Sequence, residues 1–353
     1  MARDISITTS TGVVKKGSVA SASGGPLAKL KRNRTCFWVL GALILLVIIG
    51  LGVGLGVGLT RRSNDDSAEN AVGNSTDGAD KSGTSSISTN TSGSNGIKTV
   101  TETYKVRPSQ TATAAHWQPT AGETWQITLI GPPNNTDEKV SAYDLDLFDN
   151  SLSFIASLKL KGYKIICYFS AGSYEDWRPD SKNFTKEDYG EAMDGWEGEW
   201  WVDTNSENIR SITSERIALA QSKGCDAIDP DNINGYQNPT GFNLTEEDAV
   251  SFVEFMAGEA HGRGMAMGLK NGGAIVDQVV EFTDFCVQES CVAYNECGPY
   301  RRFLEYNSPV FHLEYPDESE MTVAEICSPK NGAQGFSTLI KHLILDDWTE
   351  YCP

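Results

Sequence analysis

Short apolar runs alternate with amphipathic stretches from Trp117 to the end of the chain. Runs rich in Ile, Val, Phe and Tyr predict strands, and the stretches between them have the spacing of helices that cover a sheet. Strands are predicted at 125–129, 143–148, 164–169, 225–229, 265–269, 282–288, 310–314 and 339–345. Strands that alternate with helices form a parallel sheet, and this number of units in about 240 residues predicts an α/β fold of the (β/α)8, TIM-like barrel class.

Some of the intervening helices have recognisable first turns. The segment Thr245-Glu-Glu-Asp precedes an apolar face and is typical of a capping box, and the stretch 214–223 is similar. The alternative fold is a doubly wound open sheet. We favour the barrel because no glycine-rich phosphate loop follows the first predicted strand.

One apolar run, from Phe37 to Leu59, contains no charged residue and is long enough to cross a bilayer. A cleaved signal peptide is the alternative, but many polar residues precede the run. Because basic residues are concentrated before it, we expect residues 1–36 to form a cytoplasmic disordered tail and 37–59 a transmembrane helix. Residues 60–115, rich in Ser, Thr and Gly, are expected to form a disordered stalk, and 116–353 an extracellular domain of a single-pass type II plasma-membrane protein.

The extracellular assignment agrees with the cysteines and with five N-x-[ST] glycosylation tripeptides beyond the span. Seven cysteines follow the span, and disulfides are their expected use. Cys291 with Cys297 and Cys327 with Cys352 are plausible local pairs, and the odd number leaves one thiol over. A zinc site is the weaker alternative because no C-x-x-C pair is present, so we expect no metal.

The C-terminal domain is strongly acidic. From His116 onward it has 40 Asp and Glu residues against 16 Lys and Arg residues. Nucleic acid is therefore not expected as a partner. The charge serves either solubility or the attraction of a cationic substrate.

Acidic residues follow several predicted strands, at the ends where barrel enzymes carry their active sites. The second, fourth, sixth and seventh strands end in Asp144-Leu-Asp146-Leu-Phe-Asp149, Asp229-Pro-Asp231-Asn232, Gln288-Glu289 and Glu314-Tyr-Pro-Asp317. A carboxylate beside a buried strand costs free energy unless it is hydrogen-bonded or used. Asp and Asn are also common in turns, but their combination at four strand ends indicates a site.

Paired carboxyl groups are what glycosidic cleavage requires: one attacks the anomeric carbon or activates water, and the other protonates the leaving oxygen. Aromatic rings that stack on sugars would complete such a site, and the alternative is that they pack in the core. The aromatic residues near the predicted barrel mouth are Tyr168, Tyr174, Trp177, Trp196, Trp200, Trp201, Tyr236 and Tyr294.

An ordered set of motifs runs through this domain. It comprises Trp125-Gln-Ile, Tyr143-Asp-Leu-Asp-Leu-Phe-Asp149, Cys167-Tyr-Phe-Ser-Ala-Gly172 with Glu175 and Trp177-Arg-Pro-Asp180, Gly224-Cys-Asp-Ala-Ile-Asp-Pro-Asp-Asn232, Gly268-Leu-Lys-Asn271, and Glu289 with Tyr294-Asn-Glu296. The set resembles glycoside hydrolase family 114, the endo-α-1,4-polygalactosaminidases, and especially its fungal membrane-anchored members.

The resemblance implies a barrel that cleaves α-1,4-linked galactosamine stretches of a cationic polysaccharide with retention of configuration and without a cofactor. By motif, Asp231 is the expected nucleophile and Glu289 the general acid and base. Asp231 must stay ionised while Glu289 holds a proton. Asp229 remains an alternative nucleophile, because it points to the same side of the strand as Asp231.

The remaining candidate residues are expected to bind the substrate or to secure the charge of Asp231. They are Asp229, Asn232, Asp144, Asp146, Tyr168, Glu175, Trp177, Lys270, Asn271, Tyr294 and Glu296. Two other functions remain open: a non-catalytic cell-wall carbohydrate-binding protein, and an α-galactosidase-like hydrolase of a neutral polymer.

Overall fold

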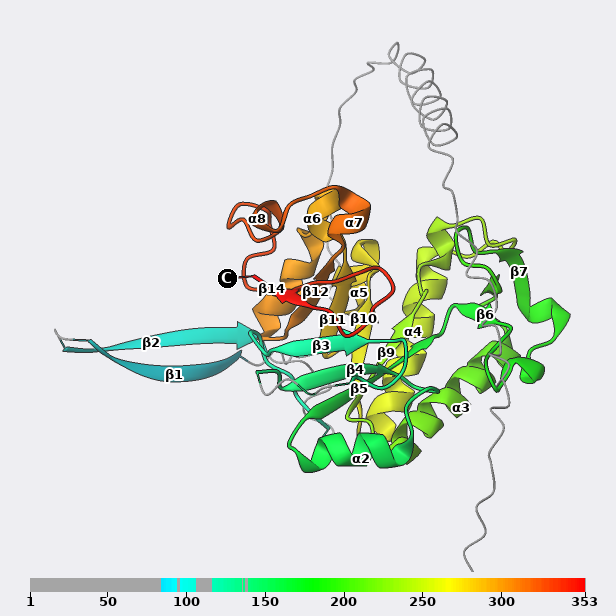
Figure 1. The fold of residues 1–353 in the computed structure, drawn as a ribbon, viewed down its shortest axis with the longest axis horizontal. Coiled ribbons are helices and arrows are strands. Elements are labelled where there is room, and N and C mark those ends of the chain that lie inside the picture. The colour runs from blue at the N-terminus through cyan, green and yellow to red at the C-terminus, as the bar shows by residue number, and fades with distance from the viewer. Residues whose placement is uncertain (1–83, 94–95, 106–115, 135, 137–138, 353) are drawn as a thin grey trace, which may run out of the picture. The chain divides into compact units, whose positions relative to one another are not determined.

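A computed structural model of the chain describes residues 84–93, 96–105, 116–134, 136 and 139–352 (Figure 1). Its central sheet contains eight parallel strands. They are β3 (Trp125–Thr128), β4 (Ala142–Asp146), β5 (Lys164–Ser170), β9 (Ala227–Asp231), β10 (Ala266–Lys270), β11 (Phe285–Glu289), β12 (Val310–Glu314) and β13 (Ser337–Ile340). Each predicted strand is thus confirmed, with ends shifted by a few residues.

The strands lie beside one another in chain order, from β3 to β13, and the sheet curls (Figure 1). A doubly wound sheet would reverse its strand order at a switch point, so this α/β fold is of the TIM-like class. The sheet differs from the predicted closed barrel, because no strand pairing in the described residues joins its first strand, β3, to its last strands. The short strand β14 (Glu350–Tyr351) pairs antiparallel with β13, and β3 approaches that edge through single contacts, such as Trp125 Nε1 to the Ser337 carbonyl oxygen at 2.8 Å.

Successive side chains along each strand point to opposite faces of the sheet and so form two packing layers. One face of the sheet encloses an apolar cluster that includes Trp125, Ile166, Phe285 and Phe311. The opposite face packs against helices in a second, larger cluster. At the carboxyl ends of the strands the enclosed positions become polar, and this change of composition marks the site described below.

The helices that connect the strands are mostly short. The α-helices are α2 (Leu152–Leu160), α3 (Glu207–Lys223), α4 (Glu246–Gly262), α5 (Val276–Val279), α6 (Cys291–Tyr294), α7 (Pro316–Ser319) and α8 (Val323–Ile326). The 3-10 helices are η2 (Ser181–Asn183), η3 (Lys186–Asp188), η4 (Gly235–Gln237), η5 (Gly273–Ile275) and η6 (Pro299–Tyr306).

The sequence located one helix start correctly and one incorrectly. Thr245 caps α4 and forms the predicted capping box with Asp248. The stretch 214–223 is the second half of α3, because Ser206 caps that helix and accepts a hydrogen bond from Ile209 N. Ser214 lies inside α3, where its hydroxyl donates to Glu259 on α4, so its hydrogen bond joins two helices and caps neither.

A small antiparallel sheet is inserted between β5 and α3. Its strands are β6 (Ser173–Glu175), β7 (Tyr189–Ala192) and β8 (Glu199–Val202), with β8 in the middle. The insertion begins where two segments of the backbone approach closely, because a Cβ on Gly172 would lie 1.7 Å from the Asn232 carbonyl oxygen. Only glycine fits there. The disulfide Cys167–Cys225 joins β5 to the turn between α3 and β9, on either side of this segment.

The two predicted disulfides, Cys291–Cys297 and Cys327–Cys352, are both present. Spacing along the chain did not suggest the third pair, Cys167–Cys225, because its members lie 58 residues apart. The thiol left over is Cys286, which is buried.

The prediction of a disordered stalk is wrong for part of its length, because residues 84–105 contain an antiparallel hairpin of β1 (Thr84–Gly93) and β2 (Gly96–Lys105). The Thr, Ile and Val residues of β2 favour an extended strand. At its end, Lys105 pairs with Glu305 at 2.6 Å. The predicted membrane span, 37–59, lies outside the described residues. Among the residues that are described, no helix has the length and apolar character needed to cross a bilayer.

Candidate active site

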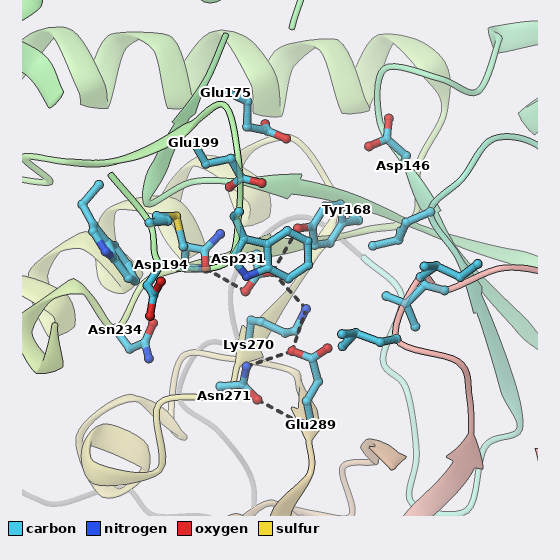
Figure 2. Close-up of a pocket in the computed structure, with 18 of the residues that line it drawn as sticks. Asp146, Tyr168, Glu175, Asp194, Glu199, Asp231, Asn234, Lys270, Asn271 and Glu289 are labelled. Carbon is cyan, nitrogen blue, oxygen red and sulfur yellow. Dashed lines mark hydrogen bonds and ion pairs between the residues drawn. The ribbon is translucent and has the colours of Figure 1, made fainter. Parts of the chain in front are cut away.

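Three neighbouring strands end in charged residues that lie together, Asp231 on β9, Lys270 on β10 and Glu289 on β11 (Figure 2). The Lys270 ammonium nitrogen is 3.3 Å from Asp231 Oδ2 and 3.5 Å from Glu289 Oε2. These two oxygens are therefore no more than about 7 Å apart, which is below the upper limit of about 10 Å for glycosidase carboxyl pairs. Lys270 is the shared counterion of the pair.

The chain turns sharply after each of these residues. Asn232, Asn271 and Ser290 follow them directly and have φ angles of 63°, 51° and 60°. These are left-handed conformations, which Asn tolerates better than most residues. Each strand therefore stops immediately after its charged residue, which becomes the last enclosed position on that strand.

Asp231 is held by three donors. Its Oδ1 accepts a hydrogen bond from Asn232 N at 2.7 Å, and its Oδ2 accepts one from the Tyr168 hydroxyl at 3.0 Å. The Lys270 ammonium adds a positive charge on the same oxygen. These three contacts fix the position of the Asp231 carboxyl group on the cavity floor.

Glu289 has a different environment. Its Oε2 accepts from Asn271 Nδ2 at 3.0 Å, and Oε1 lies 2.5 Å from the Tyr315 hydroxyl. Tyr315 was missed by the sequence analysis, which considered only the acids of the segment Glu314-Tyr-Pro-Asp317. Parity along β12 would have identified it, since Leu313 is enclosed by the sheet and Tyr315 is the next residue on that face.

These residues form the floor of a cavity of about 700 Å³. Its walls come from the inserted sheet and from the loops after β3 and β13. Two exposed indoles on the wall, Trp177 and Trp196, are 53% and 54% accessible. Of the other predicted aromatics, Tyr168 and Trp201 line the cavity, whereas Tyr174, Trp200, Tyr236 and Tyr294 do not.

Asp146 and Glu175 also line the cavity, but both are used in a buried ion pair. Arg178 lies 2.7 Å from Asp146 Oδ2 and 2.9 Å from Glu175 Oε1. The other Asp146 oxygen accepts hydrogen bonds from two backbone amides, those of residues 148 and 149. Arg178 therefore offsets part of the negative charge of these two residues.

Asp144 and Asp229 do not reach the cavity, in contrast to the prediction. Both are fully buried and absent from the cavity lining. Asp144 points to the same side of β4 as Asp146, and Asp229 to the same side of β9 as Asp231. Both lie further from the cavity, one layer of side chains below it. Direct contact of Asp144 or Asp229 with a sugar is excluded by this burial.

Tyr294 and Glu296 are likewise displaced from the predicted position. Both are exposed and neither lines the main cavity. After the left-handed Ser290 the chain forms α6, which the disulfide Cys291–Cys297 closes. Glu296 borders a smaller neighbouring hollow that shares Asn271 and Glu289 with the main cavity.

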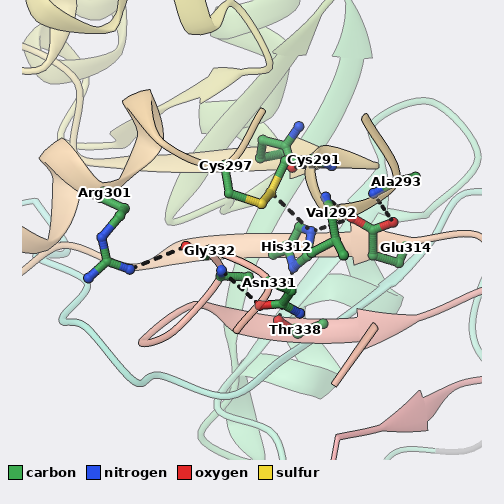
Figure 3. Close-up of a disulfide and its surroundings, with 12 residues drawn as sticks. Cys291, Val292, Ala293, Cys297, Arg301, His312, Glu314, Asn331, Gly332 and Thr338 are labelled. Carbon is green, nitrogen blue, oxygen red and sulfur yellow. Dashed lines mark hydrogen bonds and ion pairs between the residues drawn. A yellow bond between two sulfur atoms is a disulfide. The ribbon is translucent and has the colours of Figure 1, made fainter. Parts of the chain in front are cut away.

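Glu314 belongs to a structural network beside that disulfide (Figure 3). It is buried, and its carboxylate oxygen accepts from Val292 N at 2.7 Å and lies 2.8 Å from His312 Nε2. The acid at this strand end therefore anchors the start of α6 and faces away from the cavity.

Glu199 on β8 is an acidic lining residue that the sequence analysis did not select. Its Oε2 accepts a hydrogen bond from the Ser173 hydroxyl at 2.9 Å. Burial and the nearby Glu175 carboxylate raise the pKa of Glu199 to about 7. No basic side chain forms an ion pair with Glu199 in the described part of the chain. It can therefore supply a negative charge that the protein has not already neutralised.

A model of glycoside hydrolase family GH114 matches residues 106–353. The chain belongs to this family. It is therefore a glycoside hydrolase. Ega3 from Aspergillus fumigatus, solved in complex with galactosamine, is 44% identical over 68% of this chain and 99% of that chain, with a TM-score of 0.65. The glycoside hydrolase domain of PelA from Pseudomonas aeruginosa is 12% identical over 65% and 98%, with a TM-score of 0.51, and supports the fold alone. A comparison with curated proteins gave no match.

Within the described part of this family 114 enzyme, two groups of residues could hold a metal ion, and both lie outside the cavity. Among the described residues, His116, His261 and Asp284 form one such group, but Asp284 already accepts hydrogen bonds from both rings. The other group contains Cys291 and Cys297, whose sulfurs are joined in a disulfide. None of these residues lines the cavity.

Proposed function

We propose that this enzyme hydrolyses internal α-1,4 linkages in galactosamine stretches of a cationic polysaccharide, with Asp231 and Glu289 as the catalytic pair and with retention of configuration. The observation that carries the proposal is the position of both carboxyl groups on the cavity floor around one buried lysine. Retaining glycosidases use one carboxylate as nucleophile and one carboxylic acid to protonate the leaving oxygen.

Asp231 is the better nucleophile of the two aspartates at the end of β9. Its side chain is 17% accessible, whereas that of Asp229 is fully buried. Tyr168 and Lys270 hold the Asp231 carboxyl group at the cavity floor, and attack on the anomeric carbon uses its carboxylate form. In this role Asp231 forms the covalent bond to the sugar while the glycosidic bond to the leaving group breaks.

Glu289 acts first as the acid and then as the base. It gives its proton to the leaving glycosidic oxygen, and as a carboxylate it then takes a proton from the water that releases the sugar from Asp231. The hydroxyl of Tyr315 suits this alternation, because it can accept a hydrogen bond from the acid and donate one to the carboxylate.

A galactosamine substrate is supported by the wall of the cavity and by the relative crystallised with galactosamine. Glu199 and Asp194 line the cavity near the two exposed indoles. An ammonium group binds favourably to carboxylates in such a partly buried site, and a sugar ring stacks on an indole. The acidic excess of the domain would concentrate a polycation in a salt-dependent way.

The test is incubation of the purified full-length chain with deacetylated galactosamine polymer, with its fully acetylated form and with a neutral galactose polymer. We expect a ladder of oligosaccharides from the deacetylated polymer, with the α-anomer formed first by NMR. Monosaccharide as the first product would contradict endo cleavage. Cleavage of the neutral polymer alone would support an α-galactosidase-like enzyme, and binding without cleavage would support a carbohydrate-binding protein.

We also propose that residues 37–59 anchor the enzyme in the plasma membrane as a single-pass type II protein with the catalytic domain outside. The uncharged apolar run and the basic residues before it support this orientation. The three disulfides of the catalytic domain agree with an oxidising compartment. Protease added to intact cells should release the catalytic domain, and protection of that domain until lysis would contradict the orientation.

A further inference from the structure

Two carboxyl groups lie beneath the floor of the active site. Asp144 and Asp229 are each 0% exposed. The Lys270 ammonium nitrogen is 3.7 Å from Asp229 Oδ2, so the lysine lies between this buried pair and the two carboxyl groups of the floor. One cation is thus surrounded by four acids, of which two have no route to solvent or substrate.

The buried pair lacks hydrogen-bond donors. No donor in the described part of the chain serves either oxygen of Asp144 or of Asp229. Two ionised carboxylates that are fully buried without donors cost several kcal/mol. A proton on one of them removes a charge and at the same time supplies the missing donor, because a carboxylic acid donates its hydroxyl hydrogen.

The electrostatic environment assigns that proton to Asp144. The carboxyl groups of Asp144 and Asp229 lie within hydrogen-bonding reach of each other. Burial, reinforced by this neighbouring carboxyl, raises the pKa of Asp144 well above its usual value. Burial also raises the pKa of Asp229, to about 7, although Lys270 opposes this shift. Burial disfavours the charged Lys270, but the surrounding carboxylates outweigh it and raise the pKa of Lys270.

We propose that Asp144 and Asp229 are positioning residues that hold one proton between them, with Asp144 as donor, and that the remaining negative charge on Asp229 offsets the Lys270 ammonium. This inference rests on the proposed function. If Asp229 carried no negative charge, the Lys270 ammonium would act on Asp231 and Glu289 as an uncompensated cation. Asp231 would then be a weaker nucleophile, and Glu289 would lose its proton at a lower pH.

The charged and titratable groups around Asp229 come from four strands of the sheet. They are Asp144 on β4, Asp231 on β9, Lys270 on β10, and Glu289 and the Cys286 thiol on β11. Removal of the Asp229 charge makes the floor more positive for both catalytic carboxyl groups. Both limbs of the pH profile of kcat/KM should then move in the same direction, to lower pH.

The first experiment compares the pH profiles of the full-length enzyme and its Asp229→Asn variant on galactosamine polymer. We expect both limbs to move down by about 1 pH unit, equivalent to a 10-fold change in each protonation equilibrium. Glu254→Gln, which removes one exposed charge from α4, is the matched control and should leave the profile unchanged. A lower rate with limbs in their original positions would mean that Asp229 has a purely structural role, and would overturn the proposal.

The second experiment tests whether the role of Asp144 is to donate a hydrogen bond to Asp229. In Asp144→Asn the amide can still donate to Asp229, so the profile should remain that of the unaltered enzyme. In Asp144→Leu the donor is lost, Asp229 takes up the proton itself, and the profile should match that of Asp229→Asn. Equal profiles for the two Asp144 variants would overturn the proposal, as would failure of Asp144→Asn to fold, since the amide supplies the same hydrogen bond.

The two ideas fail in different ways. If the unaltered chain cleaves none of the polymers, the proposed function is wrong. A second outcome is that the unaltered chain cleaves the galactosamine polymer with a bell-shaped pH profile that is the same in Asp229→Asn and Asp144→Leu. In that case the proposed function is correct and the proposed role of the buried pair is wrong. If Asp229→Asn does not fold, the two Asp144 variants decide the question by themselves.

Discussion

The floor of the active site and the wall beside it are built in different ways. The floor consists of the last residues of three parallel strands, and each of its carboxylates is held by two or more neighbours. The wall is an inserted antiparallel sheet with half-exposed indoles and with acids such as Asp194 that are open to solvent. Fixed, shielded groups suit bond making and breaking, whereas open groups suit the recognition of a long, mobile polymer.

The largest effects are expected on the floor. Asp231→Asn and Glu289→Gln should each lower kcat by about 10³-fold or more, because each removes a group that takes part in bond making or proton transfer. The measurement is the initial rate of oligosaccharide release, with thermal unfolding as the control for folding. Substantial hydrolysis by either folded variant would contradict its role and remove the functional distinction between floor and wall.

The next largest effects are expected from the tyrosines that form hydrogen bonds with the carboxyl groups of the floor. Tyr315→Phe deletes the hydroxyl beside Glu289 and should lower kcat by about 10- to 100-fold, since a hydrogen bond to a charged group contributes about 1.5 to 3 kcal/mol. KM should change little, because the hydroxyl contacts the catalytic acid. Tyr168→Phe makes the same change beside Asp231 and is the matched comparison. A rise in KM with kcat unchanged would assign Tyr315 to substrate binding.

The same contrast explains what the sequence could and could not predict. The carboxyl ends of parallel strands lie at one edge of the sheet. The proximity of Asp231, Lys270 and Glu289 could therefore be predicted, although they are far apart in the chain. Strand parity gives the side on which a residue lies but not its depth. Asp229 and Asp231 therefore looked equivalent, although only Asp231 reaches the cavity.

The wall was less predictable because long-range pairing creates it. Arg178 was visible only as part of a motif, and its ion pairs with Asp146 and Glu175 depend on how the insertion folds back over β4. Glu199 is brought to the cavity by the pairing of β8 with β6, for which the apolar pattern gave no signal. Residues after β11 were misplaced because the left-handed Ser290 redirects the chain into α6.

On the wall, Glu199 provides a pH-dependent contribution. Because its pKa is about 7, the side chain is mostly neutral at pH 6 and mostly charged at pH 8. Glu199→Gln should therefore raise KM for galactosamine oligomers by about 5-fold at pH 8, equivalent to about 1 kcal/mol, and much less at pH 6. Acetylated oligomers, which lack the ammonium group, are the control. An equal increase at both pH values would mean that the Glu199 charge is not what binds the sugar.

The smallest effect is expected from the exposed indole of Trp196. Its replacement by Ala removes a stacking surface that contributes about 0.5 kcal/mol, the lower end of the range for aromatic stacking, so KM should rise by about 2-fold while kcat stays unchanged. The increase should be larger for long oligomers than for short ones, because a residue 54% exposed on the wall contacts sugars away from the bond that is cleaved. Trp177→Ala is the parallel variant on the same wall. A fall in kcat of the same size as that of Tyr315→Phe would place the indole in the chemistry of the floor, and the division between the two regions would then be wrong.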